Sequence, residues 1–352
     1  MSPSEASPEQ GVRTPAAPSP DAADVLDARG LTVTLATGRG AAATVVDAVD
    51  VRIGRGRRLA LVGESGSGKS VTAMALMGLV DPPLSARAER LVVNGRDVAG
   101  LGPRQWRDVR GNEIGLVQQD PLTALSPVVD VGSQVAEPLR RHRGLSRSRA
   151  RARAVELLGL VGIPDAAARS RDYPHQLSGG LRQRVAVAAA LACEPQVLLA
   201  DEPTTALDVT VQAQVLELLL RLADEQGIGV LLITHDLALL PGFAHDVAVM
   251  YAGRIVENGA CHLVLDRPRH PYTAMLLAAQ PGRSPELAKR RLPVIGGLPP
   301  SPQRRPPGCP FAPRCPLATE LCRTTVPQLR HLEGRLVACH RAEDVDRLAP
   351  VA

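Results

Sequence analysis

A glycine-rich segment close to residue 65 has the residue types and the spacing of a phosphate-binding loop. The segment and the residue after it read Gly63, Glu64, Ser65, Gly66, Ser67, Gly68, Lys69, Ser70 and Val71. An apolar run that predicts a buried strand precedes the segment, and an apolar stretch that predicts a helix follows it. Glycines let the backbone curl so that its N–H groups point at phosphate oxygens, and the helix start adds partial positive charge. We therefore expect Lys69 to reach the β- and γ-phosphates of a nucleotide and Ser70 to bind Mg²⁺. The alternative is a chance glycine-rich turn.

A second apolar run ends in two carboxylates, Asp201 and Glu202. A magnesium ion at a phosphate loop needs a carboxylate from the end of a neighbouring buried strand, and Asp201 can supply it. Glu202 is then placed to polarise an attacking water molecule as a general base. Alone, such a run is weak evidence, because many strands end in acidic loops. Beside the phosphate loop it predicts nucleotide hydrolysis, since a glutamine at position 202 would indicate a crippled site.

A third motif lies between these two and contains Leu177, Ser178, Gly179, Gly180 and Leu181. It resembles the signature sequence of ABC ATPases. Gln119 matches the Q-loop glutamine of that family, residues 205–208 match its D-loop, which ends in Asp208, and His235 matches its switch histidine. Alone, His235 would be interpreted as a structural histidine at a strand end, but its place in the ordered set favours a functional role. The resemblance covers roughly residues 31–259.

The resemblance implies a mechanism in which two ATPase domains face head to tail. Each ATP would lie between the phosphate loop of one subunit and the signature of the other, where Ser178 and Gly180 offer a hydroxyl and an N–H to the γ-phosphate. Gln119 would contact Mg²⁺, together with Ser70 and Asp201, and relay its state to the helical subdomain. His235 would contact the γ-phosphate.

The expected architecture is an α/β fold of the P-loop ABC ATPase type. It comprises a RecA-like parallel sheet core, an N-terminal antiparallel β subdomain and a helical signature subdomain at about 120–180, followed by a cysteine-containing C-terminal extension. The expected boundaries are a disordered Pro/Ala-rich tail at 1–27, the ATPase domain at 28–280 and the extension at 281–352. Hydrophobic patterning predicts strands at 31–35, 45–53, 59–62, 114–118, 197–200 and 229–234, a hairpin at 247–257, and helices at 70–80, 185–193 and 211–225.

Several stretches are typical of the oligopeptide and dipeptide permease group, which also handles nickel and similar solutes. Leu181 is apolar where many ABC ATPases carry glutamine, and the stretches at 120–127, 249–257 and 270–273 agree with that group. The resemblance implies an importer ATPase for peptides, or for nickel or another small solute. Its expected partners are a second ABC ATPase subunit in a heterodimer, two transmembrane permease subunits and an extracytoplasmic solute-binding protein.

Four cysteines cluster near the C-terminus, at Cys309, Cys315, Cys322 and Cys339. The intervals between them are too wide for the paired knuckles of a zinc ribbon. Four thiolates suit a tetrahedral Zn²⁺ or a cubane iron–sulfur cluster. The segment resembles the cysteine-bearing tail of peptide permease ATPases, some of which hold a [4Fe–4S] cluster, so cluster, zinc and free thiols all remain open. Cys193 and Cys261 stand apart as core or surface thiols.

Apolar run length, net charge and the number of ATPase units limit the other classes of protein to which the chain could belong. No apolar run approaches the ~18–20 residues of a membrane-spanning helix, so we expect a peripheral protein on the cytoplasmic face of the membrane. The net charge of +5 is compatible with nucleic acid or an anionic membrane surface, but also with solvated arginines such as those dense between 140 and 153. ABC ATPases that act on nucleic acid or ribosomes usually carry two ATPase units, whereas this sequence shows one, so no nucleic acid is expected. Lys69, Asp201, Glu202 and His235 argue against a catalytically dead binding module.

One position departs from the family pattern. ABC ATPases usually stack the adenine on an aromatic residue of the first strand, and the aligned position here is Leu35. An aliphatic side chain can cover one face of the base but lacks the π-face contact. We expect modest ATP affinity and weak discrimination between ATP and GTP.

Overall fold

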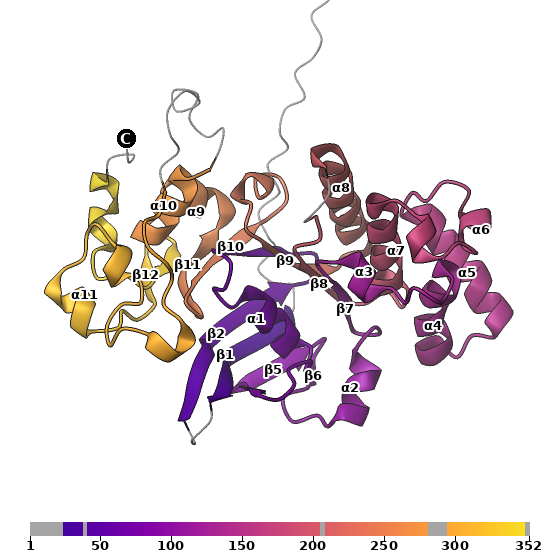
Figure 1. Ribbon diagram of the computed structural model, residues 1–352, viewed down its shortest axis with the longest axis horizontal. Coiled ribbons are helices and arrows are strands. Elements are labelled where there is room, and N and C mark those ends of the chain that lie inside the picture. Colours follow the sequence, from indigo (N-terminus) through magenta and orange to yellow (C-terminus); the bar gives the residue numbers. More distant parts are fainter. Residues whose placement is uncertain (1–23, 38–40, 205–207, 281–293, 349–352) are drawn as a thin grey trace, which may run out of the picture.

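The computed structural model describes residues 24–37, 41–204, 208–280 and 294–348. The expected tail up to residue 23, the D-loop residues 205–207 and the start of the extension at 281–293 lie outside the described residues. Two sheets organise the rest, with a helical arm on one side and the C-terminal extension on the other (Figure 1).

The N-terminal sheet is antiparallel and lies below the main sheet in Figure 1. Its strands are β1 (Asp24–Thr37), β2 (Ala41–Gly54), β4 (Leu84–Arg87), β5 (Arg90–Val93) and β6 (Arg96–Asp97). The strands expected at 31–35 and 45–53 lie within β1 and β2, and β1 begins before the expected boundary at residue 28. Apolar side chains such as Leu26, Val33 and Val46 are buried against the same core cluster as α1 (Lys69–Leu76).

The main sheet has eight strands in the order β12-β13-β11-β10-β3-β9-β8-β7. They are β3 (Arg58–Val62), β7 (Ile114–Val117), β8 (Val197–Asp201), β9 (Gly229–Thr234), β10 (Asp246–Tyr251), β11 (Arg254–Ala260), β12 (Arg330–Leu332) and β13 (Arg335–Val337). β3, β7, β8, β9 and β10 run parallel. Every residue of β3 and β9 is buried, as apolar strands covered on both faces require. The expected hairpin turns at Ala252 and Gly253, both at positive φ.

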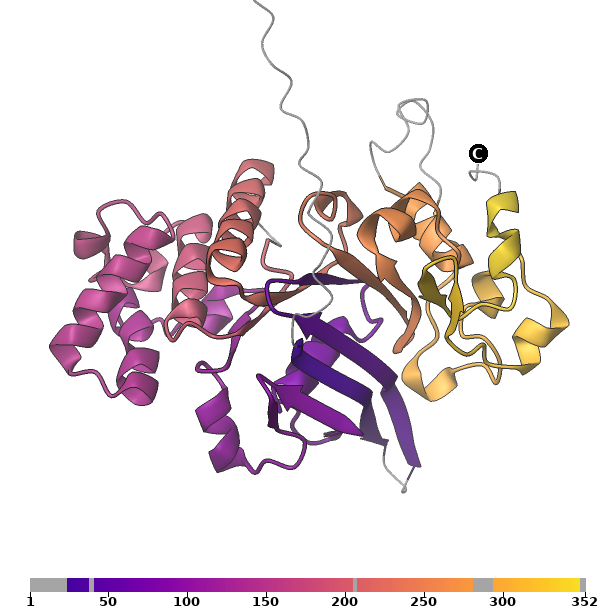
Figure 2. The same ribbon diagram turned by 180° about the vertical axis from the view of Figure 1, so that it is seen from behind.

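Helices form an arm at the β7 edge of the sheet, seen on the left from behind (Figure 2). They are α3 (Pro121–Ala124), α4 (Val131–Arg143), α5 (Arg147–Leu160), α6 (Ala166–Arg169), α7 (Gly179–Leu191) and α8 (Val209–Gln226), while α2 (Pro103–Val109) lies by the antiparallel sheet. Their apolar faces share one core with the sheet, through residues such as Val135, Leu158 and Val215. The arginines at 140, 141, 143, 147 and 149 are exposed.

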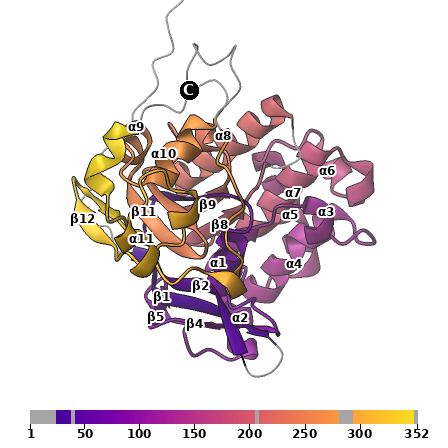
Figure 3. The same cartoon turned by 60° about the vertical axis from the view of Figure 1, so that its left-hand side comes forward.

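The C-terminal extension continues the ATPase sheet. After α9 (Cys261–Asp266) and α10 (Pro271–Ala278), the chain returns through α11 (Glu320–Thr324) and places β13 beside β11, with Glu257 opposite Val337 (Figure 3). None of the helices in the described ranges is long and apolar enough to cross a membrane.

Candidate nucleotide site

The glycine-rich segment joins β3 to α1 as a tight loop. Gly63, Gly66 and Gly68 have φ of 153°, 78° and 107°. A Cβ at Gly63 would lie 2.2 Å from the carbonyl oxygen of Met250 on β10, so only glycine lets the loop pass this close. Gly68 is the N-cap of α1 and has no side chain with which to cap the helix start. The first N–H groups of α1 are therefore oriented for an anion such as a phosphate.

Lys69 is buried beneath this loop, with 5% of its surface exposed. Its Nζ donates to the carbonyl oxygens of Gly63 at 2.8 Å and Glu64 at 3.0 Å. Burial lowers the pKa of Lys69, and the carboxylates of Glu202, Asp201 and Glu64 oppose that shift. The ammonium group therefore lies among acidic groups and carbonyls at the base of the phosphate loop.

Asp201 and Ser70 meet as the sequence predicts. Asp201 ends β8, and its Oδ1 accepts a hydrogen bond from Ser70 Oγ at 3.1 Å. Burial raises the pKa of Asp201; Glu202 adds to the shift, while Ser70 and Lys69 oppose it. A hydroxyl and a carboxylate side by side are the oxygen ligands that Mg²⁺ prefers, so these two residues fit a magnesium site shared with phosphates.

Glu202 joins two residues that come from other strand ends. Gln119 Nε2 donates to Glu202 Oε2 at 3.2 Å, and His235 Nδ1 lies 3.2 Å from the same oxygen. The three residues follow β7, β8 and β9, whose carboxyl ends share one edge of the parallel sheet. The structure therefore gathers the expected general base, Glu202, with the residues expected to contact Mg²⁺ (Gln119) and the γ-phosphate (His235).

A cavity of about 620 Å³ opens above the loop. Ten residues line it: Val45, Ser65, Gly66, Gly68, Lys69, Ser70, Val71, Gln119, Glu202 and His235. Val45 of β2 was not selected from the sequence, because nothing distinguishes it from other apolar strand residues. Leu35 is not among the residues that line this cavity.

The signature and the D-loop end lie together, away from this cavity. Ser178 is the exposed N-cap of α7, and its hydroxyl accepts from Leu181 N at 3.4 Å. Asp208 caps α8 by accepting from Val211 N at 3.0 Å. A Cβ at Gly180 would lie 2.6 Å from Val211 Cγ1, so a glycine is needed for α7 to pack this closely on α8. Among the residues that the structure describes, none of these lines the phosphate cavity of its own chain.

The four C-terminal cysteines line one small cavity beside α10 and α11, together with Phe311. None of the six cysteines is in a disulfide, and Cys193 and Cys261 are buried elsewhere. Burial raises the pKa of Cys315 to about 11 and that of Cys339 to about 12. Within the described ranges, no group of three or more His, Cys, Asp or Glu is arranged to hold a metal ion. The structure thus brings the predicted ligands to one cavity but does not present a ready single-ion site.

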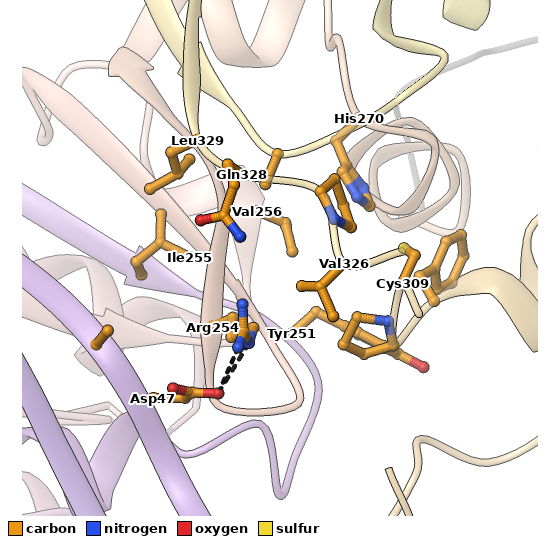
Figure 4. Close-up of a pocket in the computed structure, with 15 residues that line it drawn as sticks. Asp47, Tyr251, Arg254, Ile255, Val256, His270, Cys309, Val326, Gln328 and Leu329 are labelled. Atoms are coloured by element: carbon orange, nitrogen blue, oxygen red, sulfur yellow. Dashed lines mark hydrogen bonds and ion pairs between the residues drawn. The ribbon is translucent and has the colours of Figure 1, made fainter. Parts of the chain in front are cut away.

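A further cavity of about 190 Å³ lies at the seam between ATPase core and extension (Figure 4). Asp47 of β2 closes one side through an ion pair with Arg254 at 2.7 Å, and Val326 and Leu329 of the extension line the opposite side. Close to it, Tyr251, Tyr272 and Phe311 pack ring against ring, with centroids 4.7–5.4 Å apart. In a chain with only 2% aromatic residues, this cluster fixes the extension on the core.

Comparison with known proteins assigns the family. The profile described as "ABC transporter" matches residues 46–205, and that described as "Oligopeptide/dipeptide transporter, C-terminal region" matches residues 256–322. The dipeptide transport ATP-binding protein DppD of Escherichia coli (strain K12) is 48% identical over 84% of this chain and 90% of its own length. The chain belongs to the ATP-binding subunits of the oligopeptide and dipeptide ABC transporter family. A putative peptide import ATP-binding protein of Brucella abortus (strain 2308) is 50% identical over 84% of this chain and 88% of its own.

Solved structures agree with this assignment. A bacterial ABC transporter cassette, solved as a dimer in a post-hydrolysis state with ADP and Pi, has a TM-score of 0.59 at 28% identity, covering 67% of this chain and 98% of its own. A cassette of the cbiONQ transporter complex from Clostridium perfringens has a TM-score of 0.57 at 27% identity, covering 69% and 91%. The predicted ABC ATPase fold is confirmed. As a member of this ATPase family, the chain hydrolyses ATP.

Proposed function

We propose that the protein is the ATP-hydrolysing subunit of an ABC importer for oligopeptides or dipeptides. The observation that carries the proposal is the convergence of Gln119 and His235 on Glu202 beside the phosphate loop, in a chain whose relatives are named for peptide import. The same motor role for nickel or another small solute has less support, because these relatives are named for peptides. An ABC ATPase of nucleic acid or ribosomes also has less support, because the C-terminal region matches a transporter family.

In the proposed mechanism, the loop N–H groups and Lys69 bind the β- and γ-phosphates of ATP. Ser70 and Asp201, with Gln119 close by, would hold Mg²⁺, which supplies positive charge for the phosphate oxygens. Glu202 orients a water molecule and accepts its proton as the water oxygen bonds to the γ-phosphorus and the bond to the β,γ-bridging oxygen of ADP breaks. His235 contacts the γ-phosphate, and its Nδ1, 3.2 Å from Glu202 Oε2, keeps that carboxylate beside the phosphate.

We propose that the chain works on the cytoplasmic face of the membrane with partners that supply the pore. A second ABC ATPase subunit would bring its own signature to this phosphate loop and receive Ser178 and Gly180 in exchange. The exposed helix starts of α7 and α8 support such an exchange. Two permease subunits would dock on the helical arm at 122–170, and a solute-binding protein would deliver the peptide from outside.

The test is solute-dependent ATP hydrolysis by the assembled transporter. We expect the isolated chain to hydrolyse ATP slowly, and the rate to rise when the second ATPase and the permeases are added in lipid nanodiscs. Solute-binding protein loaded with a dipeptide should raise the rate further, whereas the same protein loaded with nickel should not. A Lys69→Ala chain is the control for contaminating ATPases. Full, peptide-responsive activity of the isolated chain, or a response to nickel alone, would contradict the proposal.

We further propose that Cys309, Cys315, Cys322 and Cys339 hold a structural [4Fe–4S] cluster. Their common cavity and the absence of disulfides among them support this assignment. Within the described ranges no group of three or more ligating residues is arranged to hold a metal ion, so the proposal rests on the shared cavity and on the four-thiol set, which would supply the ligands of a cubane cluster. The positive charge of the iron atoms would favour the thiolates against the burial that raises their pKa.

Metal analysis of anaerobically purified protein tests the cluster. We expect a brown protein with iron and acid-labile sulfide in near-equal amounts, and loss of both in Cys315→Ser or Cys322→Ser. Cys193→Ala is the matched control, because Cys193 lies outside the cavity and should leave the iron content unchanged. Colourless protein with one zinc per chain would show that the four cysteines hold zinc instead of a cluster. Metal-free protein would show that they are free thiols.

A further inference from the structure

An arginine of the C-terminal extension forms an ion pair with the phosphate loop. Arg314 Nη1 lies 2.7 Å from Glu64 Oε2, and Arg314 Nη2 lies 2.9 Å from Glu64 Oε1. These parallel bonds form a bidentate pair, the strongest geometry available to an arginine and a carboxylate. The arginine side chain is 5% exposed, and the two residues are 250 positions apart in the sequence.

Arg314 is itself held by the extension. Its Nη2 also donates to the carbonyl oxygen of Ile295 at 3.1 Å, and its Nε donates to that of Gly296 at 2.9 Å. The guanidinium lies 5.7 Å from the ring centre of Tyr251 and donates to its hydroxyl at 3.2 Å. Because Arg314 precedes Cys315 and its N–H donates to Phe311 O at 2.9 Å, the shape of the cysteine-bearing loop determines where the guanidinium lies.

Glu64 is also held through its backbone. Its N–H donates to the hydroxyl of Tyr272 at 2.7 Å, and Tyr272 is fully buried beneath the loop. The carbonyl oxygen of Glu64 accepts from Lys69 Nζ at 3.0 Å and from Ser67 N at 3.2 Å. A displacement of Glu64 would therefore move a hydrogen-bond partner of the lysine that reaches for the phosphates.

We propose that Arg314 is a positioning residue for ATP binding: through Glu64, it holds the first turn of the phosphate loop in the conformation that accepts nucleotide. The C-terminal extension thereby sets the ATP affinity of the cassette. Anchoring the extension alone does not require this contact, because β13 already pairs with β11 and the aromatic cluster packs the two parts together. The proposal rests on the ATPase activity of the family and needs no particular state of the cysteines.

A double-mutant cycle on the full chain tests the contact. Arg314→Ala and Glu64→Ala should each weaken the binding of a non-hydrolysable ATP analogue by about ten-fold, because the loop is no longer held. In the assembled transporter both should raise KM for ATP while kcat changes little, since neither residue touches the reacting atoms. The double variant should be no worse than either single variant, because both remove the same link. Arg314→Lys, which cannot form the bidentate fork, should fall between Arg314→Ala and the parent.

Arg323→Ala is the matched control within the extension. Its side chain is 63% exposed and lies 3.9 Å from Glu320, so nucleotide binding should equal that of the parent. Thermal unfolding and metal content, measured on every variant, separate loss of the contact from loss of the fold. Glu64→Ala keeps the contacts of Arg314 with Ile295, Gly296 and Tyr251, so it breaks the link without removing the anchor. Parent-like nucleotide affinity in Glu64→Ala and Arg314→Ala, or additive losses in the double variant, would overturn the proposal.

Discussion

Glu202 adopts a backbone conformation with positive φ, which few residues other than glycine tolerate. Its φ is 44°, and its N–H donates to Ile233 O at 2.9 Å, which ties the residue to β9. A strained backbone of this kind persists only where its surroundings hold it, and it costs about 1–3 kcal/mol. At the end of β8 the strained turn directs the carboxylate to Gln119 and His235 instead of continuing the strand. The geometry supports the role that we assign to this side chain.

The absence of an aromatic at Leu35 gives a prediction for a single side chain. Leu35 pairs with Ala43 and Leu84 in the antiparallel sheet, and Val45 lines the phosphate cavity. Stacking of a base on an aromatic ring is worth ~1–3 kcal/mol, so Leu35→Tyr should tighten ATP binding by about ten-fold and favour ATP over GTP. Titration with both nucleotides measures the effect, and Leu35→Met is the control for size without a π-face. Tight, adenine-selective binding by the parent would mean that another residue, such as Val45, supplies the platform.

At the scale of elements, the sequence predicts the interiors of strands and helices better than their ends. β3 and β9 are recognisable because their apolar runs are buried on both faces. The helix expected at 185–193 begins earlier, at Gly179, because Ser178 caps it, and a capping residue leaves no mark in hydrophobic periodicity. Likewise, α8 begins at Val209 because Asp208 accepts from Val211 N. The motif residues therefore mark these helix starts better than periodicity does.

Elements that exist only through tertiary contacts were not predicted. β12 and β13 are three residues each; β13 forms because β11 offers an edge to pair with, and β12 forms by pairing with β13. β4 carries mostly exposed residues and lacks an apolar pattern. The sequence assigned Glu64 to the phosphate loop and Cys315 to the extension, but it gave no sign that Arg314 joins the two parts. A contact across 250 positions depends on how the extension folds back, which local patterns do not encode.

At the scale of the whole molecule, we propose that a second cassette completes the nucleotide site of this chain. Of the described residues, those that line the phosphate cavity include neither Ser178 nor Gly180, which lie exposed or half-exposed at the start of α7. The dimeric cassette that this fold resembles was solved with ADP and Pi. A second cassette placed head to tail would bring its own signature to this cavity and cover the γ-phosphate with a helix N-terminus.

This arrangement leads to a prediction for Glu202→Gln in the assembled transporter. ATP binding should persist, because the phosphate contacts and the Ser70–Asp201 pair are unchanged, whereas hydrolysis at the site of this chain should fall by about 10²–10⁴-fold with its general base removed. The two cassettes should then remain closed around ATP, and nucleotide should stay bound through gel filtration.

Adding Ser178→Glu to the same chain places a carboxylate against the γ-phosphate held by the partner subunit. Because Ser178 does not line the cavity of its own chain, ATP affinity of the isolated chain should be unchanged while the closed pair is lost. Hydrolysis by Glu202→Gln at the parent rate would show that another group takes the proton, and weaker ATP binding by the isolated Ser178→Glu chain would show that the signature acts within one chain.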